Sequence, residues 1–209
     1  MSETKLPPVA GVLLAGGLSR RMGGGDKCLR ELGERTVLEH VIERATPQVR
    51  ALMLNANGDA ARFEGFGLEV VADEVDGHAG PLAGVLTGMA WARAAAPDCP
   101  FIATFATDAP FFPRDMVAVM EEGLRTAAAE MAVAASDGRM HPVFGLWPVR
   151  LEGELREALT REGVRKIDVW TARYRLVEVD FPLTGLDPFF NANSPADLAR
   201  AEQALARGQ

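Results

Sequence analysis

Near its N-terminus the chain reads Val9-Ala10-Gly11-Val12-Leu13-Leu14-Ala15-Gly16-Gly17-Leu18-Ser19-Arg20-Arg21-Met22-Gly23-Gly24-Gly25-Asp26-Lys27. Its first six residues are an apolar run, typical of a central strand in a parallel sheet, because such a strand is buried on both faces. Five glycines, two arginines and a lysine follow. Glycine lets the main chain approach an anion closely, successive N–H groups form an anion-binding nest, and basic side chains add charge. The stretch therefore predicts a strand that leads into a polyphosphate-binding loop.

Two widespread phosphate-binding loops have a different spacing. The P-loop requires Gly-x-x-x-x-Gly-Lys-Ser/Thr, whereas Asp26 here stands between Gly25 and Lys27. The dinucleotide fingerprint requires Gly-x-Gly-x-x-Gly directly after a strand, and the glycines after Leu14 do not match it. The alternative is a surface loop with incidental charges. Basic residues directly behind a buried strand favour a nucleotide loop of another kind.

Composition limits the classes of protein to consider. The chain has 209 residues, 48% of them hydrophobic, and a net charge of −7, which suits one soluble α/β domain and argues against a nucleic-acid partner. No apolar run approaches the roughly 20 residues of a membrane span. The polar segment Met1 to Pro8 is unlike a signal peptide. We therefore expect a cytoplasmic protein that does not contact a membrane.

Strand and helix patterns alternate along the whole chain. A Thr36–Glu39 capping box begins one helix, Ser194 and Pro195 begin the last, and Asp137-Gly138 marks a hairpin. We expect strands at 9–14, 52–55, 68–72, 101–106, 131–135, 142–147 and 176–179, and helices at 36–49, 81–96, 114–129, 151–161, 166–173 and from 195. This order predicts one domain over 1–209, with an α/β fold of three layers (α/β/α) and a mostly parallel, Rossmann-like sheet that has an antiparallel part.

Polar residues stand where four of these strands end. The glycine-rich loop follows the first strand, Asn55 and Asn57 end the second, Asp73 follows the third, and Asp108 follows the strand 101–106. Ligands of open α/β sheets bind beyond the carboxyl ends of the strands. The sequence therefore predicts one ligand site at that edge of the sheet.

Each of these polar residues has a functional and a structural interpretation. Asp108 suits Mg²⁺, which takes one or two carboxylates with phosphate oxygens and water, but aspartate before Pro110 is also common in turns. Asn55 and Asp73 suit a base or a ribose through hydrogen bonds, and Asn55 also suits a plain turn. A second glycine-containing turn, Gly80 to Gly84, leads into a helix N-terminus, which favours anions.

Cysteine and histidine give weaker signals. Cys28 and Cys99 lack metal-binding spacing and are expected to be buried, although Lys27 beside Cys28 would activate its thiol somewhat. His78 and His141 lie on predicted loops, where they either face a ligand or are structural. The spacing imposes no Ser–His–Asp arrangement and no zinc cluster.

Taken together, several segments resemble the molybdenum cofactor guanylyltransferases of the MobA type. The similarity extends from about Val9 to Ala204. Its most specific part is the first loop with its Gly-Gly-x-Asp-Lys ending. The segments that carry it are Leu14 to Gly17, Arg20 to Lys27, Asn55 to Asn57, Gly80 to Gly84, Asp108 to Pro110 and Asn191 to Leu198.

The resemblance implies a nucleotide-diphospho-sugar-transferase-like fold, Mg²⁺ dependence, and transfer of GMP from GTP to Mo-molybdopterin with release of pyrophosphate. By matching positions, Arg21, Lys27 and Asp108 would be catalytic, with Asp108 the metal ligand. The nucleotide would contact Leu14, Ala15, Gly16, Gly17, Lys27, Asn55, Asp73 and Asp108. The acceptor would contact Gly80, Gly84, Asn191, Asn193 and Arg165, or Lys166 in place of Arg165.

The same resemblance divides the chain into a nucleotide-binding part, about 9–110, and an acceptor-binding part, about 111–209. GTP and Mo-molybdopterin are the expected partners, with molybdoenzymes or their chaperones as recipients of the product, and we expect a monomer. Three alternatives stay open: a molybdopterin cytidylyltransferase, a sugar-phosphate nucleotidyltransferase, and a non-catalytic protein that binds a nucleotide and delivers the cofactor. A dehydrogenase is disfavoured because the dinucleotide fingerprint is missing.

Overall fold

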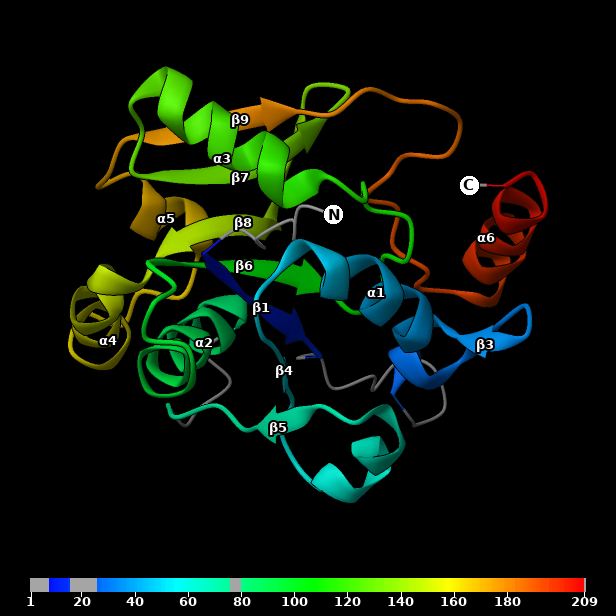
Figure 1. Ribbon diagram of the computed structural model, residues 1–209, viewed down its shortest axis with the longest axis horizontal. Helices are drawn as coiled ribbons and strands as arrows, with labels where there is room; N and C mark the ends of the chain where they lie inside the picture. The colour runs from blue at the N-terminus through cyan, green and yellow to red at the C-terminus, as the bar shows by residue number, and fades with distance from the viewer. Residues whose placement is uncertain (1–7, 16–25, 76–79, 209) are drawn as a thin grey trace, which may run out of the picture.

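The computed structural model describes residues 8–15, 26–75 and 80–208. A seven-stranded sheet with the order β5-β4-β1-β6-β8-β7-β9 forms the centre of this part of the chain (Figure 1). The predicted strands are all present, with small shifts at their ends. Their bounds are β1 Val9–Leu14, β4 Leu52–Asn55, β5 Glu69–Val71, β6 Phe101–Ala106, β7 Met131–Ser136, β8 Arg139–Pro148 and β9 Leu176–Asp180.

The sheet is mixed, as the hairpin signal predicts. Strand β1 pairs in parallel with β4 and β6, whereas β8 runs antiparallel to both β6 and β7. Asp137 and Gly138 join β7 to β8 with φ values of 48° and 71°. Positive φ at both central residues suits the twist of a two-residue hairpin. The reversal at β8 makes β7 and β9 parallel to β1, so the carboxyl ends of β1, β4, β5, β6, β7 and β9 share one edge of the sheet, here called the carboxyl edge.

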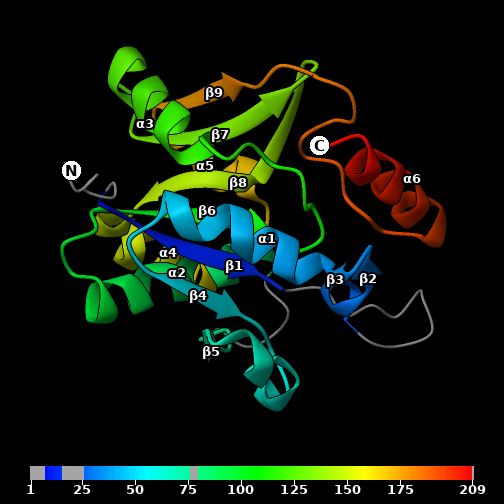
Figure 2. The ribbon, with the colours of Figure 1, turned by 45° about the vertical axis from the view of Figure 1, so that its right-hand side comes forward.

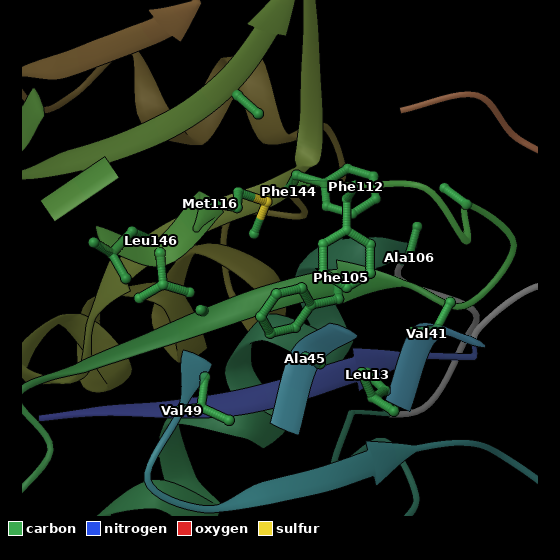
Figure 3. Close-up of a cluster of buried hydrophobic side chains, with 14 of the residues drawn as sticks. Leu13, Val41, Ala45, Val49, Phe105, Ala106, Phe112, Met116, Phe144 and Leu146 are labelled. Atoms are coloured by element: carbon green, nitrogen blue, oxygen red, sulfur yellow. The ribbon is translucent and has the colours of Figure 1, made fainter. Parts of the chain in front are cut away.

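Helices cover both faces of the sheet and give the expected three layers. Helices α1 (Val37–Ala45) and α3 (Met116–Ala127) pack on one face, and α2 (Pro81–Ala95), α4 (Glu152–Thr160) and α5 (Ile167–Thr171) pack on the other. Figures 1 and 2 show the two helical layers. In Figure 3, Val41 of α1 and Met116 of α3 lie over Leu13 and Phe105 of the strands.

Several short elements were not apparent from the sequence. Strands β2 (Glu31–Leu32) and β3 (Arg35–Thr36) form a small hairpin against which α6 (Pro195–Ala206) packs. Two-residue strands are too short to show an alternating pattern. The first helix ends at Ala45 rather than near 49, because Pro47 lacks the N–H that an α-helical hydrogen bond needs. The 3-10 turns are η1 Lys27–Leu29, η2 Thr46–Gln48, η3 Ala60–Phe66 and η4 Val149–Leu151.

Both predicted helix caps are present. Thr36 Oγ1 accepts a hydrogen bond from Glu39 N at 3.2 Å, and Ser194 Oγ accepts one from Asp197 N at 3.1 Å. Among the described residues, no helix is both long and apolar enough to cross a membrane. The caps fix the beginnings of α1 and α6, which both lie on the side of the molecule toward which β1 points (Figure 1).

Candidate active site

Three side chains form a hydrogen-bonded group at the ends of β4 and β5. We call Asn55, Asn57 and Asp73 the Asn55–Asp73 corner. Asn55 Nδ2 donates to Asp73 Oδ1 at 2.9 Å, and Asn57 Nδ2 donates to Asp73 Oδ2 at 2.8 Å. Asp73 N donates to Asn57 Oδ1 at 2.8 Å. The predicted convergence of Asn55 and Asp73 is confirmed, and the carboxylate of Asp73 is held in one orientation.

The members of this corner differ in accessibility. Asn55 is only 3% exposed, and its Nδ2 also donates to Val71 O at 3.1 Å. Asn57 is exposed and Asp73 is half-buried. Asn57 and Asp73 are therefore the members accessible from solvent, while Asn55 lies buried behind them. Direct contact between Asn55 and a nucleoside stays a prediction. Asn57, which was expected at this edge of the sheet but was given no ligand contact, is the more accessible of the two asparagines.

Gly84 lies behind the same corner. A Cβ atom at this position of α2 would overlap with Asn55 Oδ1 and with Leu14 Cδ2. Only glycine lets α2 come this close to β1 and β4. The structure thus gives Gly84 a packing role beneath the corner, and its contact with an acceptor stays a prediction.

Lys27, Asp108 and the segment around Asn193 meet at the carboxyl edge. Lys27 Nζ donates to Asn193 Oδ1 at 2.8 Å, although the two residues are 166 positions apart. Ala192 N donates to Asp108 O at 2.8 Å. The structure thus brings Lys27 and Asp108, predicted to bind the nucleotide and the metal, close to Asn193, which was predicted to bind the acceptor. We call Lys27, Asp108, Ala192 and Asn193 the junction.

Asp108 has the chemistry of a cation ligand. Burial raises the pKa of its carboxyl, while the positive charge of Lys27 and its own backbone N–H act in the opposite direction. Among the described residues, no side chain donates a hydrogen bond to this carboxylate. A half-buried carboxylate whose oxygens are bonded by none of the described side chains, beside an ammonium group, suits a site where a divalent cation and phosphates bind together.

Backbone bonds at the end of β1 limit what Leu14 and Ala15 offer to a nucleotide. Ala15 N donates to Asn55 O at 2.9 Å, and Thr107 Oγ1 donates to Leu14 O at 3.2 Å. A hydrogen bond from Ala15 N to a nucleotide would need the first of these to break. Of the other predicted residues, Gly16, Gly17, Arg20, Arg21 and His78 lie outside the described residues.

Arg62 joins the phosphate loop to the corner, and no sequence motif pointed to it. Its Nε lies 2.5 Å from Asp26 Oδ2, and its Nη2 donates to Asn57 O at 2.7 Å. Asp26 directly precedes Lys27, so one guanidinium contacts both sides of the predicted nucleotide site. Arg62 lies in η3, which has no recognisable pattern. Its contacts with Asp26 and Asn57 are seen only in the folded structure, because these residues are not linked to Arg62 by any sequence pattern.

The remaining acceptor candidates lie in two places. Gly80 begins α2 with φ of +70°, and a Cβ there would lie 3.6 Å from the Arg165 carbonyl oxygen. The Arg165 Nη1 donates to Leu159 O at 2.7 Å and to Val164 O at 2.9 Å. Lys166 is exposed, as is Asn191. Gly80, before α2, and Arg165, between α4 and α5, are thus neighbours in space, and both lie on segments other than the one that holds Asn191 and Asn193.

The expectation for Cys28 is corrected in one respect. The side chain is buried, as predicted for a small apolar residue, at 4% exposure. Burial and the charge of Asp26 raise the pKa of its thiol to about 11. The neighbouring Lys27 therefore does not activate this thiol, because burial and the carboxylate of Asp26 both favour the neutral thiol.

Comparison with known proteins places the chain in a family. The family model described as the MobA-like NTP transferase domain matches residues 11–174. A protein named molybdenum cofactor guanylyltransferase from Rhodopseudomonas palustris is 52% identical over 201 residues, which is 96% of each chain.

Solved structures share the fold. Molybdopterin-guanine dinucleotide biosynthesis protein A from Archaeoglobus fulgidus superposes with a TM-score of 0.70 at 23% identity, covering 95% of this chain and 100% of that one. The 2-C-methyl-D-erythritol 4-phosphate cytidylyltransferase from Thermus thermophilus superposes with a TM-score of 0.65 at 22% identity, covering 94% and 98%. The predicted nucleotide-diphospho-sugar-transferase-like fold is confirmed. The chain belongs to the MobA-like NTP transferase family, among the molybdenum cofactor guanylyltransferases.

Proposed function

We propose that this protein transfers GMP from GTP to the terminal phosphate of Mo-molybdopterin, which gives molybdopterin guanine dinucleotide and pyrophosphate. The observation that carries the proposal is the junction, where Lys27, Asp108 and Asn193 converge in a chain 52% identical to a named guanylyltransferase. The Asn55–Asp73 corner would hold the nucleoside, and the segment with Asn191 and Asn193 would face the acceptor.

Mg²⁺ fits the residues at the junction. Asp108 offers one carboxylate without a side-chain donor among the described residues, and the phosphates of the nucleotide would supply further oxygen ligands. No group of three or more His, Cys, Asp or Glu within the described ranges forms a self-sufficient metal cage. When bound, Mg²⁺ neutralises charge on the phosphates and makes the α-phosphorus more electrophilic. Asp108 is the residue that we propose holds it.

The chain's own groups position and stabilise charge rather than form a covalent intermediate. An oxygen of the acceptor phosphate forms a bond to the α-phosphorus of GTP, and the bond from that phosphorus to the bridging oxygen of pyrophosphate breaks. A phosphate monoester is largely ionised near neutral pH, so the attack needs no general base. Lys27, with Arg21, would stabilise the negative charge that develops on the leaving pyrophosphate. Asn193 would hold the Lys27 ammonium group at the junction in the free protein, and phosphate oxygens would replace Asn193 as its hydrogen-bond acceptor when the nucleotide binds.

A titration with the two candidate nucleotides tests the proposal. Purified protein with Mg²⁺ is expected to bind GTP at least about 10-fold more tightly than CTP, a difference of about 1.4 kcal/mol. With Mo-molybdopterin it is expected to release pyrophosphate and form the guanine dinucleotide. Tighter binding of CTP would favour a cytidylyltransferase, whose fold is the same. Binding of GTP without any pyrophosphate release would favour a non-catalytic delivery protein.

Three expectations complete the proposal. The product would pass to molybdoenzymes or their chaperones. The reaction would take place in the cytoplasm, and the protein would act as a monomer. Each of these stays a prediction from the sequence and from the family resemblance.

A further inference from the structure

A buried polar group outside the junction ties together the β7–β8 hairpin and the segment that leads to α6. Ser136 ends β7 and is 0% exposed. His141 Nε2 lies 2.7 Å from Ser136 Oγ, and Ser136 Oγ donates to Asp187 Oδ1 at 3.0 Å. The single hydroxyl proton of Ser136 is used toward Asp187, so His141 Nε2 is the donor in the first bond.

The order of these three residues along the hydrogen-bond chain differs from that of a hydrolytic triad. In such a triad the histidine lies between the carboxylate and the serine, and takes the proton of the serine. Here Ser136 lies in the middle, donates to the carboxylate, and is closed to solvent. Its oxygen is therefore a structural link and not a nucleophile.

The link fixes the start of the 187–193 segment. Asp187 Oδ1 also accepts a hydrogen bond from Phe189 N at 2.9 Å, which closes a local turn. The Phe189 ring lies 4.7 Å from the His141 ring and 4.8 Å from the Phe144 ring, centroid to centroid. Phe144 in turn packs against Phe112 in the core (Figure 3). One polar and one aromatic anchor thus hold Asp187 and Phe189.

The other end of the segment is the junction itself. Only two residues separate Phe189 from Ala192, which donates to Asp108 O, and Asn193 then accepts from Lys27 Nζ. A shift at Asp187 or Phe189 therefore moves Asn191 and Asn193, because so short a segment has little slack to absorb it.

We propose that Ser136, His141 and Asp187 are positioning residues for the acceptor step: they hold the 187–193 segment so that Asn191 and Asn193 face the acceptor. This assignment rests on the proposed function for the role of the two asparagines. The anchoring itself is a property of the chain without any ligand. The two parts are therefore tested separately.

The first test needs no activity. Asp187→Ala is expected to speed amide hydrogen exchange of Ala192 and Asn193 about 10-fold, the effect of losing about 1.4 kcal/mol of local stability. Asp187→Asn keeps an acceptor oxygen and is expected to retain most of the protection. Unchanged exchange of Ala192 in Asp187→Ala would overturn the proposed anchoring, whatever reaction the protein catalyses.

The second test separates positioning from general destabilisation. We expect Asp187→Ala to raise the KM for Mo-molybdopterin about 5- to 10-fold and to leave the KM for GTP within about 2-fold, with Asp187→Asn close to the original protein. Gln48→Ala is the matched control, because Gln48 is a buried polar anchor of another loop, bonded to Pro113 O at 3.0 Å and Val117 N at 3.0 Å. It is expected to lower Tm without a selective change in either KM.

The outcomes distinguish the two proposals. If Asn193→Ala raises the acceptor KM and Asp187→Ala does not, the positioning role is wrong while the proposed function stands. If the original protein forms no guanine dinucleotide, the proposed function fails, and hydrogen exchange still decides whether Asp187 anchors the segment. Equal effects of Asp187→Ala and Gln48→Ala on the acceptor KM would also overturn the positioning role, because general destabilisation would then explain both.

Discussion

The Asn55–Asp73 corner takes its geometry from two neighbouring parallel strands, whereas the 187–193 segment takes its geometry from residues far away in the sequence. Asn55 is the last paired residue of the ladder between β4 and β1, and Asp73 lies two residues after β5, so the sheet itself sets their separation. The 187–193 segment belongs to no strand or helix and is held by Ser136, Asp108 and Lys27. The proposed nucleotide side is thus part of the sheet, and the proposed acceptor side is attached to it.

This difference separates two kinds of site. A corner built on strand ends is rigid and its loss affects stability, because buried groups lose partners. A segment outside the sheet and the helices, held by a few long-range contacts, changes position at less cost to the whole fold. We therefore expect changes at the corner to affect both nucleotide binding and stability, and changes in the segment to affect the acceptor step alone.

The largest effect is expected at the junction, where the two regions meet. Asp108→Asn is expected to lower kcat by about 10³-fold, because the proposed cation loses its protein ligand. The same substitution is expected to raise thermal stability although it lowers activity, which gives a second, independent measurement. Burial raises the pKa of this carboxyl, so the folded protein binds the proton more tightly than the unfolded chain. At neutral pH the ionised carboxylate therefore opposes folding, and the penalty disappears as the pH falls below the unfolded pKa of about 4.

Thermal melts of Asp108→Asn check this sign. We expect Tm to rise by about 2 °C at pH 7 and to stay nearly unchanged at a pH below 4. Asp115→Asn, a change at an exposed carboxylate beside α3, is the control for loss of one negative charge. A near-normal kcat would disprove the metal-site role, and a lower Tm at pH 7 would contradict the assigned cost of burial.

A smaller effect, on both binding and stability, is expected at the corner. Asp73→Ala removes the acceptor of Asn55 Nδ2 and Asn57 Nδ2, so we expect the KM for GTP to rise about 10-fold and Tm to fall by about 3 to 6 °C, which corresponds to about 1 to 2 kcal/mol. Kinetics with GTP varied and thermal melts measure the two effects. Glu64→Ala, at an exposed carboxylate of η3, should change neither. A selective loss of stability with normal GTP kinetics would make the corner purely structural.

The smallest effect on the fold is expected in the segment. Asn193→Ala removes one exposed hydrogen bond to Lys27, so Tm should change by less than about 1 °C. The KM for Mo-molybdopterin should rise about 3- to 5-fold, with the KM for GTP within about 2-fold. Gln203→Ala, an exposed amide on α6, should leave all three values unchanged. A larger change for GTP than for the acceptor would remove the distinction between the two regions.

The same difference explains how far the sequence could predict the site. Residues at strand ends are found from apolar runs and the rule for parallel sheets, and Asn55, Asp73 and Asp108 do lie at the carboxyl edge. Asn193 was found only through resemblance, since nothing in its local pattern links it to Lys27. Arg62 and Asp187 were missed, because their partners are Asp26 and Ser136 and long-range pairing of side chains has no local pattern. The β2–β3 hairpin was missed because its strands are too short to show an alternation.

Gly84 has a consequence for anyone who would alter this protein. Exchanging a helical glycine for alanine is a common route to higher stability, since it lowers the entropy of the unfolded chain. At this position the added methyl group would overlap with Asn55 and Leu14, below the nucleotide side. The gap between α2 and the sheet is thus fixed by the absence of a side chain, and the placement of the Asp73 carboxylate depends on that gap. A substitution chosen for thermostability at Gly84 would therefore disturb the proposed substrate site from behind.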